Sequence, residues 1–216
     1  MTVLEREVAS TGMDFASDSP PPSKAAPGSS VRRHSGLALC LAGAGLSLAS
    51  IALSPDWQGA LGAALGLLML AVAWSDSHRF VVPDVLSGAA FALGVVNGVV
   101  TSPEGELAGG LSALSRAGLM AGMFFIVRIA YQQMRKREGL GLGDVKLAAV
   151  AGAWVSLTML PIVIEMATLT ALAMYLWRQR KRRRILRANS RIPFGAFFAL
   201  AIWSGWLFDT GIGNFG

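Results

Sequence analysis

The sequence contains very little cysteine and few charged residues for its length. Of its 216 residues only Cys40 is a cysteine and 15% are charged, whereas 53% are hydrophobic. A single thiol excludes an intramolecular disulfide framework and a zinc site built from several cysteines. An ordinary soluble domain has about a quarter of its residues charged. The composition therefore excludes that class and predicts a membrane protein.

The apolar residues lie in long blocks with little polar alternation. Such blocks are typical of a polytopic helical membrane protein, because each span needs about 20 mainly apolar residues. We expect an all-α fold with six or seven transmembrane helices, since the fifth and sixth blocks are short and could form one bent unit. The predicted spans cover residues 37–53, 59–75, 84–101, 109–130, 145–159, 161–177 and 193–209.

Positive charge gathers in every second connection between these spans. Eight Lys and Arg residues lie within residues 178–191, three lie at 135–137, and Arg32 and Arg33 precede the first span. The intervening connections around residues 54–58 and 101–107 hold Asp56, Glu104 and Glu106 and no Lys or Arg. This alternation is the positive-inside pattern, and it predicts a cytoplasmic N-terminus. The net charge of +6 then reflects topology and contact with anionic membrane lipids, so no nucleic-acid partner is expected.

The first 35 residues differ in composition from the rest of the chain. They are polar and rich in Ser and Pro, with three consecutive prolines at Pro20-Pro21-Pro22. Such a stretch buries too little apolar surface to fold alone. We therefore expect a disordered cytoplasmic tail over residues 1–35 and one transmembrane domain over residues 36–216.

Two aspartates lie where predicted spans meet basic connections. Asp76 ends the second span and Asp144 begins the fifth, so the charge pattern alone puts both at the cytoplasmic side. A carboxylate beside hydrocarbon is costly and is a functional candidate. Two carboxylates held close together share a proton, which is the state that acid–base hydrolysis of a peptide bond requires. The alternative is two separate helix-end residues solvated by water of the headgroup region.

A glycine-rich stretch, Gly139-Leu140-Gly141-Leu142-Gly143, precedes Asp144. It lacks the Gly-Lys-Ser/Thr ending of a phosphate-binding loop, and no strand precedes it, so phosphate binding is not expected. Glycine permits close approach of an extended substrate backbone, because no side chain stands in the way. A plain flexible loop is the alternative.

Three motifs together resemble those of the type IV prepilin peptidases, a family of aspartic membrane proteases with a Gly-x-Gly-Asp motif. The first is Asp76 with the downstream pair Pro83-Asp84, and the second is Gly141-Leu142-Gly143-Asp144-Val145-Lys146-Leu147. The third is Arg191-Ile192-Pro193-Phe194-Gly195-Ala196. They follow the family's order and cover about residues 60–205 of the chain.

The resemblance implies that Asp76 and Asp144 are the catalytic pair and that no metal or organic cofactor takes part. Lys146 would hold developing charge or the substrate backbone, although a lysine there could equally snorkel to the headgroups. Asp84 is also interpreted as the N-terminal cap of the helix that follows it. Substrate-binding or supporting roles are implied for Gly141, Gly143, Lys146, Pro83, Asp84, Pro193, Phe194 and Gly195.

The function that the resemblance implies is removal of the basic leader from type IV prepilin or pseudopilin precursors, at the cytoplasmic face of a bacterial inner membrane. Residues 36–216 would be the peptidase domain. The chain resembles the short form of the family, because larger members carry an N-terminal methylase domain with paired Cys-x-x-Cys motifs.

Two alternatives rest on the residues alone. One is a proton-coupled transporter that titrates Asp76, Asp144 and Glu165, although the sequence shows no evident inverted repeat. The other is a non-catalytic scaffold of a pilus or secretion assembly, which would dock through the basic connection.

Overall fold

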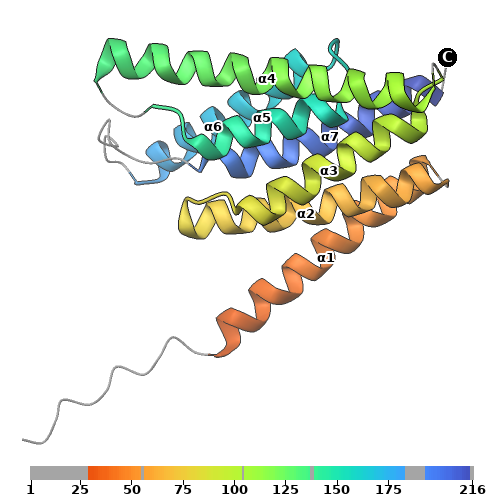
Figure 1. The fold of residues 1–216 in the computed structure, drawn as a ribbon. Coiled ribbons are helices and arrows are strands. Elements are labelled where there is room, and N and C mark those ends of the chain that lie inside the picture. The colour runs from red at the N-terminus through yellow and green to blue at the C-terminus, as the bar shows by residue number, and fades with distance from the viewer. Residues whose placement is uncertain (1–28, 55, 104, 137–138, 183–192, 215–216) are drawn as a thin grey trace, which may run out of the picture. The chain divides into compact units, whose positions relative to one another are not determined.

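The computed structural model describes residues 29–54, 56–103, 105–136, 139–182 and 193–214. Within these residues every regular element is an α-helix, which confirms the all-α prediction (Figure 1). The helices are α1 (Ser29–Leu53), α2 (Trp57–Arg79), α3 (Asp84–Thr101), α4 (Glu106–Arg135), α5 (Leu142–Trp154), α6 (Leu160–Arg182) and α7 (Phe194–Asn214).

The helices coincide with the predicted spans and confirm the prediction of a helical membrane protein. By length and composition, four of the described helices can each cross a membrane, namely α2, α3, α4 and α6. Helix α5 has only 13 residues, which at 1.5 Å per residue is about 20 Å, less than the hydrocarbon thickness of about 30 Å. The choice between six and seven spans stays a prediction.

Helix α1 begins at Ser29, before the predicted domain boundary at residue 36. The rest of the predicted tail, residues 1–28, lies outside the described residues. From Ala38 the helix is apolar up to Leu53.

Helix α5 forms the centre of the helical bundle. It packs against α3, α4 and α7 (Figure 1), and its residues Leu147, Val150 and Ala151 are fully buried. Gly152 lies directly against α4, where a methyl group would come within 2.5 Å of the Arg116 carbonyl oxygen. Glycine therefore allows the two backbones to approach closely, as is common where helices pack in membranes.

The pairs Gly62-x-x-x-Gly66 and Gly118-x-x-x-Gly122 in the sequence predict close helix packing, because small residues let helices approach each other, and the structure treats the two pairs differently. Gly62 lies against the Trp206 ring, and Gly66 lies against Trp203 and Leu46, which confirms the first pair. The second pair, Gly118 and Gly122, has nothing within 4 Å of where a methyl group would stand. Packing by this second pair therefore stays a prediction.

A tight turn joins α2 to α3 and brings an apolar side chain back into the bundle. Phe80 ends α2 in the left-handed conformation (φ 54°), and its N–H donates to the carbonyl oxygen of Asp76 at 2.9 Å. The Ser75 hydroxyl donates to the Val81 carbonyl oxygen at 2.9 Å and closes the turn. Val82, two residues after Phe80, is consequently buried beside the first residues of α5 and α7.

Candidate active site

Asp76 lies in the last turn of α2 and is held by the beginning of α7. Its carboxylate is only 6% exposed, and Oδ2 accepts the Ala196 backbone N–H at 2.8 Å. Ala196 is the third residue of α7, so this N–H has no acceptor within its own helix. The positive end of the α7 dipole also favours a carboxylate there. The arrangement therefore fixes one oxygen of Asp76 by a charge-assisted hydrogen bond.

Asp144 lies in the first turn of α5 and is half-buried. Its Oδ2 accepts the Gly141 backbone N–H at 3.2 Å, and the Asp144 N–H donates to the Gly141 carbonyl oxygen at 3.2 Å. Burial raises the pKa of the Asp144 carboxyl to about 6, the Gly141 hydrogen bond lowers it, and the charge of Asp76 raises it. The Asp76 carboxylate is thus near enough for its charge to influence Asp144.

Val82 joins the two glycine motifs to each other. A methyl group on Gly143 would lie 2.8 Å from Cγ2 of Val82, and one on Gly195 would lie 3.3 Å from the same atom. A methyl group on Gly195 would also lie 3.0 Å from Oδ2 of Asp76. These contacts bring Asp76, Val82, Gly143 and Gly195 together at one end of the bundle, which we call the Asp76 end.

The two predicted glycines before Asp144 have different surroundings. A methyl group on Gly141 would meet Oδ2 of Asp144 at 3.4 Å and the Gly143 nitrogen at 3.8 Å, both ordinary contact distances, and the residue is exposed. Gly143 has no such room, because Val82 occupies it. Packing against Val82 therefore explains why residue 143 is a glycine. Gly141 is not packed in this way and is exposed.

The pair Pro83-Asp84 begins α3, and one of its predicted roles is corrected. Pro83 is the residue that precedes the first turn, and Asp84 does not cap the helix with its side chain. The Asp84 carboxylate instead forms an ion pair with Nζ of Lys146 on α5. Lys146 therefore links α5 to α3 in this structure.

The third motif starts α7. Pro193 is buried, and the ring of Phe194 lies 5.6 Å from that of Phe198 in the core. Proline directly before a helix presets the backbone and donates no N–H that needs a partner. Pro193 and Phe194 thus hold in place the N-terminus of α7, whose Ala196 N–H binds Asp76. Arg191 and Ile192, with most of the basic connection, lie outside the described residues.

Two residues of the site were missing from the predicted set. Ala196 belongs to the third motif, but its contribution is a backbone N–H, which leaves no trace in side-chain chemistry. Val82 is an ordinary apolar residue in a turn, and only its place between two glycines reveals its role. The sequence held a hint in each case, because Ala196 ends the third motif and Val82 directly precedes Pro83.

Chemically, the site offers two carboxyl groups from different helices at one end of an apolar bundle. Asp144 titrates near the neutral range, where a general acid or base works best. No cluster of His, Cys, Asp and Glu that could hold a metal ion occurs among the described residues. The arrangement suits activation of water together with protonation of a carbonyl oxygen.

Comparison with known proteins gives a consistent result. The model of the type IV leader peptidase family matches residues 63–176, which include Asp76 and Asp144 and end before Pro193. A prepilin leader peptidase/N-methyltransferase of Aeromonas hydrophila is 29% identical over 167 residues, which cover 76% of this chain and 54% of the relative. That of Xanthomonas campestris is 31% identical over 148 residues, covering 68% and 49%.

A shorter relative is covered more completely. The leader peptidase HopD of Escherichia coli is 33% identical over 140 residues, which cover 62% of this chain and 83% of that protein. The chain spans about half the length of the peptidase/N-methyltransferases that it matches. No solved structure matches it significantly. The family match and this relative show that the chain belongs to the type IV leader peptidase family.

Proposed function

We propose that this protein is a membrane-embedded aspartic endopeptidase that removes the leader from type IV prepilin or pseudopilin precursors. The family supports the reaction class, and the named relatives support the substrate class. The observation that carries the proposal is the convergence of Asp76 and Asp144 with the N-terminus of α7.

The proposed roles of the two aspartates differ. Asp76 accepts the Ala196 N–H at a helix N-terminus, and this hydrogen bond stabilises its carboxylate form, so we assign it as the base that takes a proton from water. Asp144, whose pKa is about 6, is the acid that donates its proton to the scissile carbonyl oxygen. The water oxygen bonds to the carbonyl carbon, and a tetrahedral intermediate forms.

Collapse of that intermediate completes the reaction. The carbon–nitrogen bond breaks, and the proton that Asp76 took from water passes to the leaving amine. Asp144 regains its proton as the carbonyl re-forms, so one water is consumed and both carboxyl groups return to their starting states. No metal or organic cofactor enters these steps.

The exposed backbone around Gly141 is the proposed seat of the substrate. Leu142 is 54% exposed and Gly141 has open space on its side-chain face, so an extended peptide can approach the backbone beside Asp144. Gly143 supports the site indirectly, because its lack of a side chain lets Val82 reach both motifs. Lys146 and Asp84 support it by joining α5 to α3.

The proposed location is a bacterial inner membrane with a cytoplasmic N-terminus. Arg135 ends α4 and Lys136 follows it, and Arg178, Arg180 and Lys181 lie near the end of α6, so these cations lie at the same end of the bundle as Asp76. The positive-inside rule then turns the Asp76 end to the cytoplasm, where the cations would contact anionic lipid headgroups.

The transporter and scaffold alternatives gain no support from the relatives, whose names are those of peptidases. Glu165, which a transporter would titrate, lies exposed on α6. It is not part of the site at the Asp76 end.

Co-expression with a prepilin tests the proposal. Leader removal is followed by mass spectrometry for the wild type, for Asp76→Asn and Asp144→Asn, and for Glu165→Gln as the matched acid-to-amide control. We expect cleavage by the wild type and the control and none by the two aspartate variants. Processing by both aspartate variants would show that this pair does not catalyse the reaction. An intact precursor with the wild type would refute the substrate assignment.

A further inference from the structure

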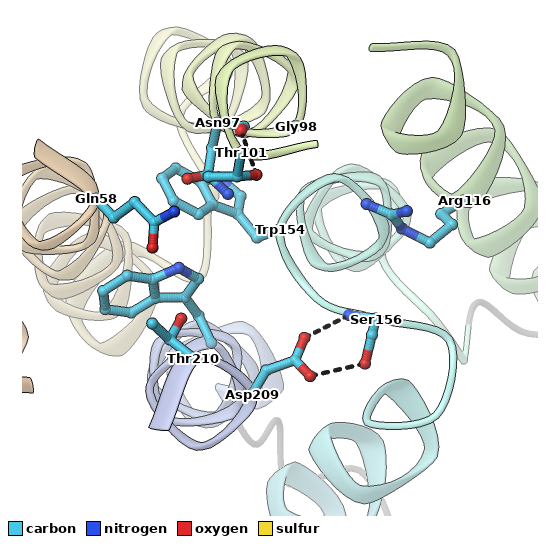
Figure 2. A pocket seen from close by; sticks show the side chains of 10 residues that line it. Gln58, Asn97, Gly98, Thr101, Arg116, Trp154, Ser156, Asp209 and Thr210 are labelled. Carbon is cyan, nitrogen blue, oxygen red and sulfur yellow. Dashed lines mark hydrogen bonds between the residues drawn. The ribbon is translucent and has the colours of Figure 1, made fainter. Parts of the chain in front are cut away.

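A polar cavity of about 420 Å³ lies at the opposite end of the bundle (Figure 2). It is lined by the first turn of α2, the last turns of α3, α5 and α7, and Arg116 of α4. We call this the Asp209 end. Its volume falls within the range of about 300–1,000 Å³ that is usual for small-molecule sites. The peptidase reaction at the Asp76 end gives it no role.

Arg116 supplies unused hydrogen-bond donors to this cavity. Its Nε donates to the Gly152 carbonyl oxygen at 3.2 Å, and its Nη1 donates to the Ser112 hydroxyl at 3.2 Å. A guanidinium carries five N–H groups, so three stay available in the described part of the chain. The geometry of a guanidinium suits phosphate oxygens.

Asp209 supplies the opposite charge. Its carboxylate accepts the Ser156 backbone N–H and the Ser156 hydroxyl, each at 2.8 Å, as the two dashed lines between these residues in Figure 2 show. A carboxylate has about four acceptor positions, so it can accept further donors. Asn97 adds a buried Oδ1 with no hydrogen-bond partner among the described residues. Such an orphaned acceptor is costly unless a donor reaches it.

Two tryptophans form apolar walls of the cavity. The rings of Trp154 and Trp206 meet edge to face, with centroids 6.2 Å apart. The Trp154 N–H is already donated to the Ala90 carbonyl oxygen at 2.7 Å, so this ring offers only its surface. Aromatic faces attract ammonium groups. Tryptophan is also enriched where helices leave the hydrocarbon, at the depth of lipid headgroups.

We propose that this cavity binds the headgroup of a zwitterionic phospholipid that carries a phosphate and a primary ammonium. The phosphate pairs with Arg116, and the ammonium donates to Asp209 and Asn97 beside the tryptophan faces. Arg116 and Asp209 are the charged side chains of the lining and have opposite signs. An isolated anion would therefore meet Asp209 and an isolated cation would meet Arg116, whereas a zwitterion satisfies both. The last residues of α3, a helix long and apolar enough to cross a membrane, line this cavity, so a lipid headgroup beside the end of that span could reach it.

Lipid retention measures the proposal directly on the wild-type chain. The protein is purified in detergent and given phosphatidylethanolamine, phosphatidylglycerol or phosphatidylcholine at equal concentration, and bound lipid is counted by native mass spectrometry. We expect one phosphatidylethanolamine to be retained at least about tenfold more tightly than the other two, which lack the ammonium or its N–H donors. Equal retention of the three lipids overturns the proposal.

Two further arms identify the source of the ligand and the residues that hold it. Free O-phosphoethanolamine is tested at the same concentration, and binding as tight as that of the lipid would overturn the lipid assignment. Asp209→Asn and Arg116→Gln should each weaken phosphatidylethanolamine retention about tenfold. Asp56→Asn is the matched control, because Asp56 is an exposed carboxylate at the same end of the bundle and makes no side-chain cap. Unchanged retention in the two cavity variants contradicts the proposal.

Discussion

A single methyl group on Gly195 should lower the catalytic rate at this site while the protein stays folded. In Gly195→Ala the new Cβ would stand 3.0 Å from Oδ2 of Asp76, 3.2 Å from its Cγ and 3.3 Å from Cγ2 of Val82. Contacts this short force a neighbour to move, and the carboxylate is the neighbour with a free rotation. It can rotate away only by lengthening its 2.8 Å hydrogen bond to the Ala196 N–H.

The expected loss follows from that hydrogen bond. A hydrogen bond to a charged group contributes about 1.5–3 kcal/mol, so its loss lowers kcat/KM by about 10- to 150-fold. Overpacking of the core costs about 1–3 kcal/mol, whereas alanine gains about 1 kcal/mol over glycine within a helix. The free energy of unfolding should therefore fall by at most about 2 kcal/mol, which leaves the protein folded at the assay temperature while kcat/KM falls by about 10- to 150-fold.

The assay compares cleavage of a prepilin-derived peptide with thermal unfolding on the same preparation. Gly118→Ala is the matched control, because nothing lies within 4 Å of a methyl group at that helical position. We expect the control to keep wild-type activity within about twofold and to gain up to about 1 kcal/mol of stability, since alanine replaces glycine inside a helix. Wild-type cleavage by Gly195→Ala would refute the placement of Gly195 against the Asp76 carboxylate.

Three further predictions concern the surroundings of Asp144. Because its pKa is raised to about 6, the carboxyl keeps its proton below that pH and loses it above, so kcat/KM should fall as the pH rises through about 6; a profile without this limb contradicts Asp144 as the acid. Gly143→Ala places a methyl group 2.8 Å from Cγ2 of Val82 and should lower the free energy of unfolding by about 1–3 kcal/mol, with partial rescue by Val82→Ala in the double variant; an unchanged melting temperature argues against the contact. The exposed ion pair of Lys146 with Asp84 should contribute only about 0–1 kcal/mol, which a double-mutant cycle of unfolding free energies measures; a coupling well above that range would mean the pair is more than a surface link.

The helices could be predicted from the sequence because hydrocarbon requires long apolar runs. The residues at which the helices begin and end could be predicted less closely. Helix α4 continues to Arg135, past the predicted end at residue 130, because its last polar residues reach water while the backbone stays helical. The brevity of α5 was visible in its apolar run, but its central place among α3, α4 and α7 was not.

The two aspartates of the candidate site could be predicted because a carboxylate beside apolar sequence is rare enough to identify on its own. The contacts that assemble the site are long-range and carry no local pattern. Asp84 and Lys146 are 62 residues apart, and the Asp76 oxygen and the Ala196 N–H are 120 residues apart. The place of Val82 depends on the left-handed Phe80, a conformation that no residue type in the turn announces.

The most direct test of the account is a comparison of single and double aspartate variants of the purified protein on one prepilin-derived peptide. Groups that act as one catalytic unit are strongly non-additive, so removal of either should cost about as much as removal of both. The account predicts that Asp76→Asn and Asp144→Asn each lower kcat by at least about 10³-fold and that the double variant is no slower than either. A single variant that keeps a tenth of the wild-type rate, or a double variant whose loss is the product of the two, would contradict a shared carboxyl pair.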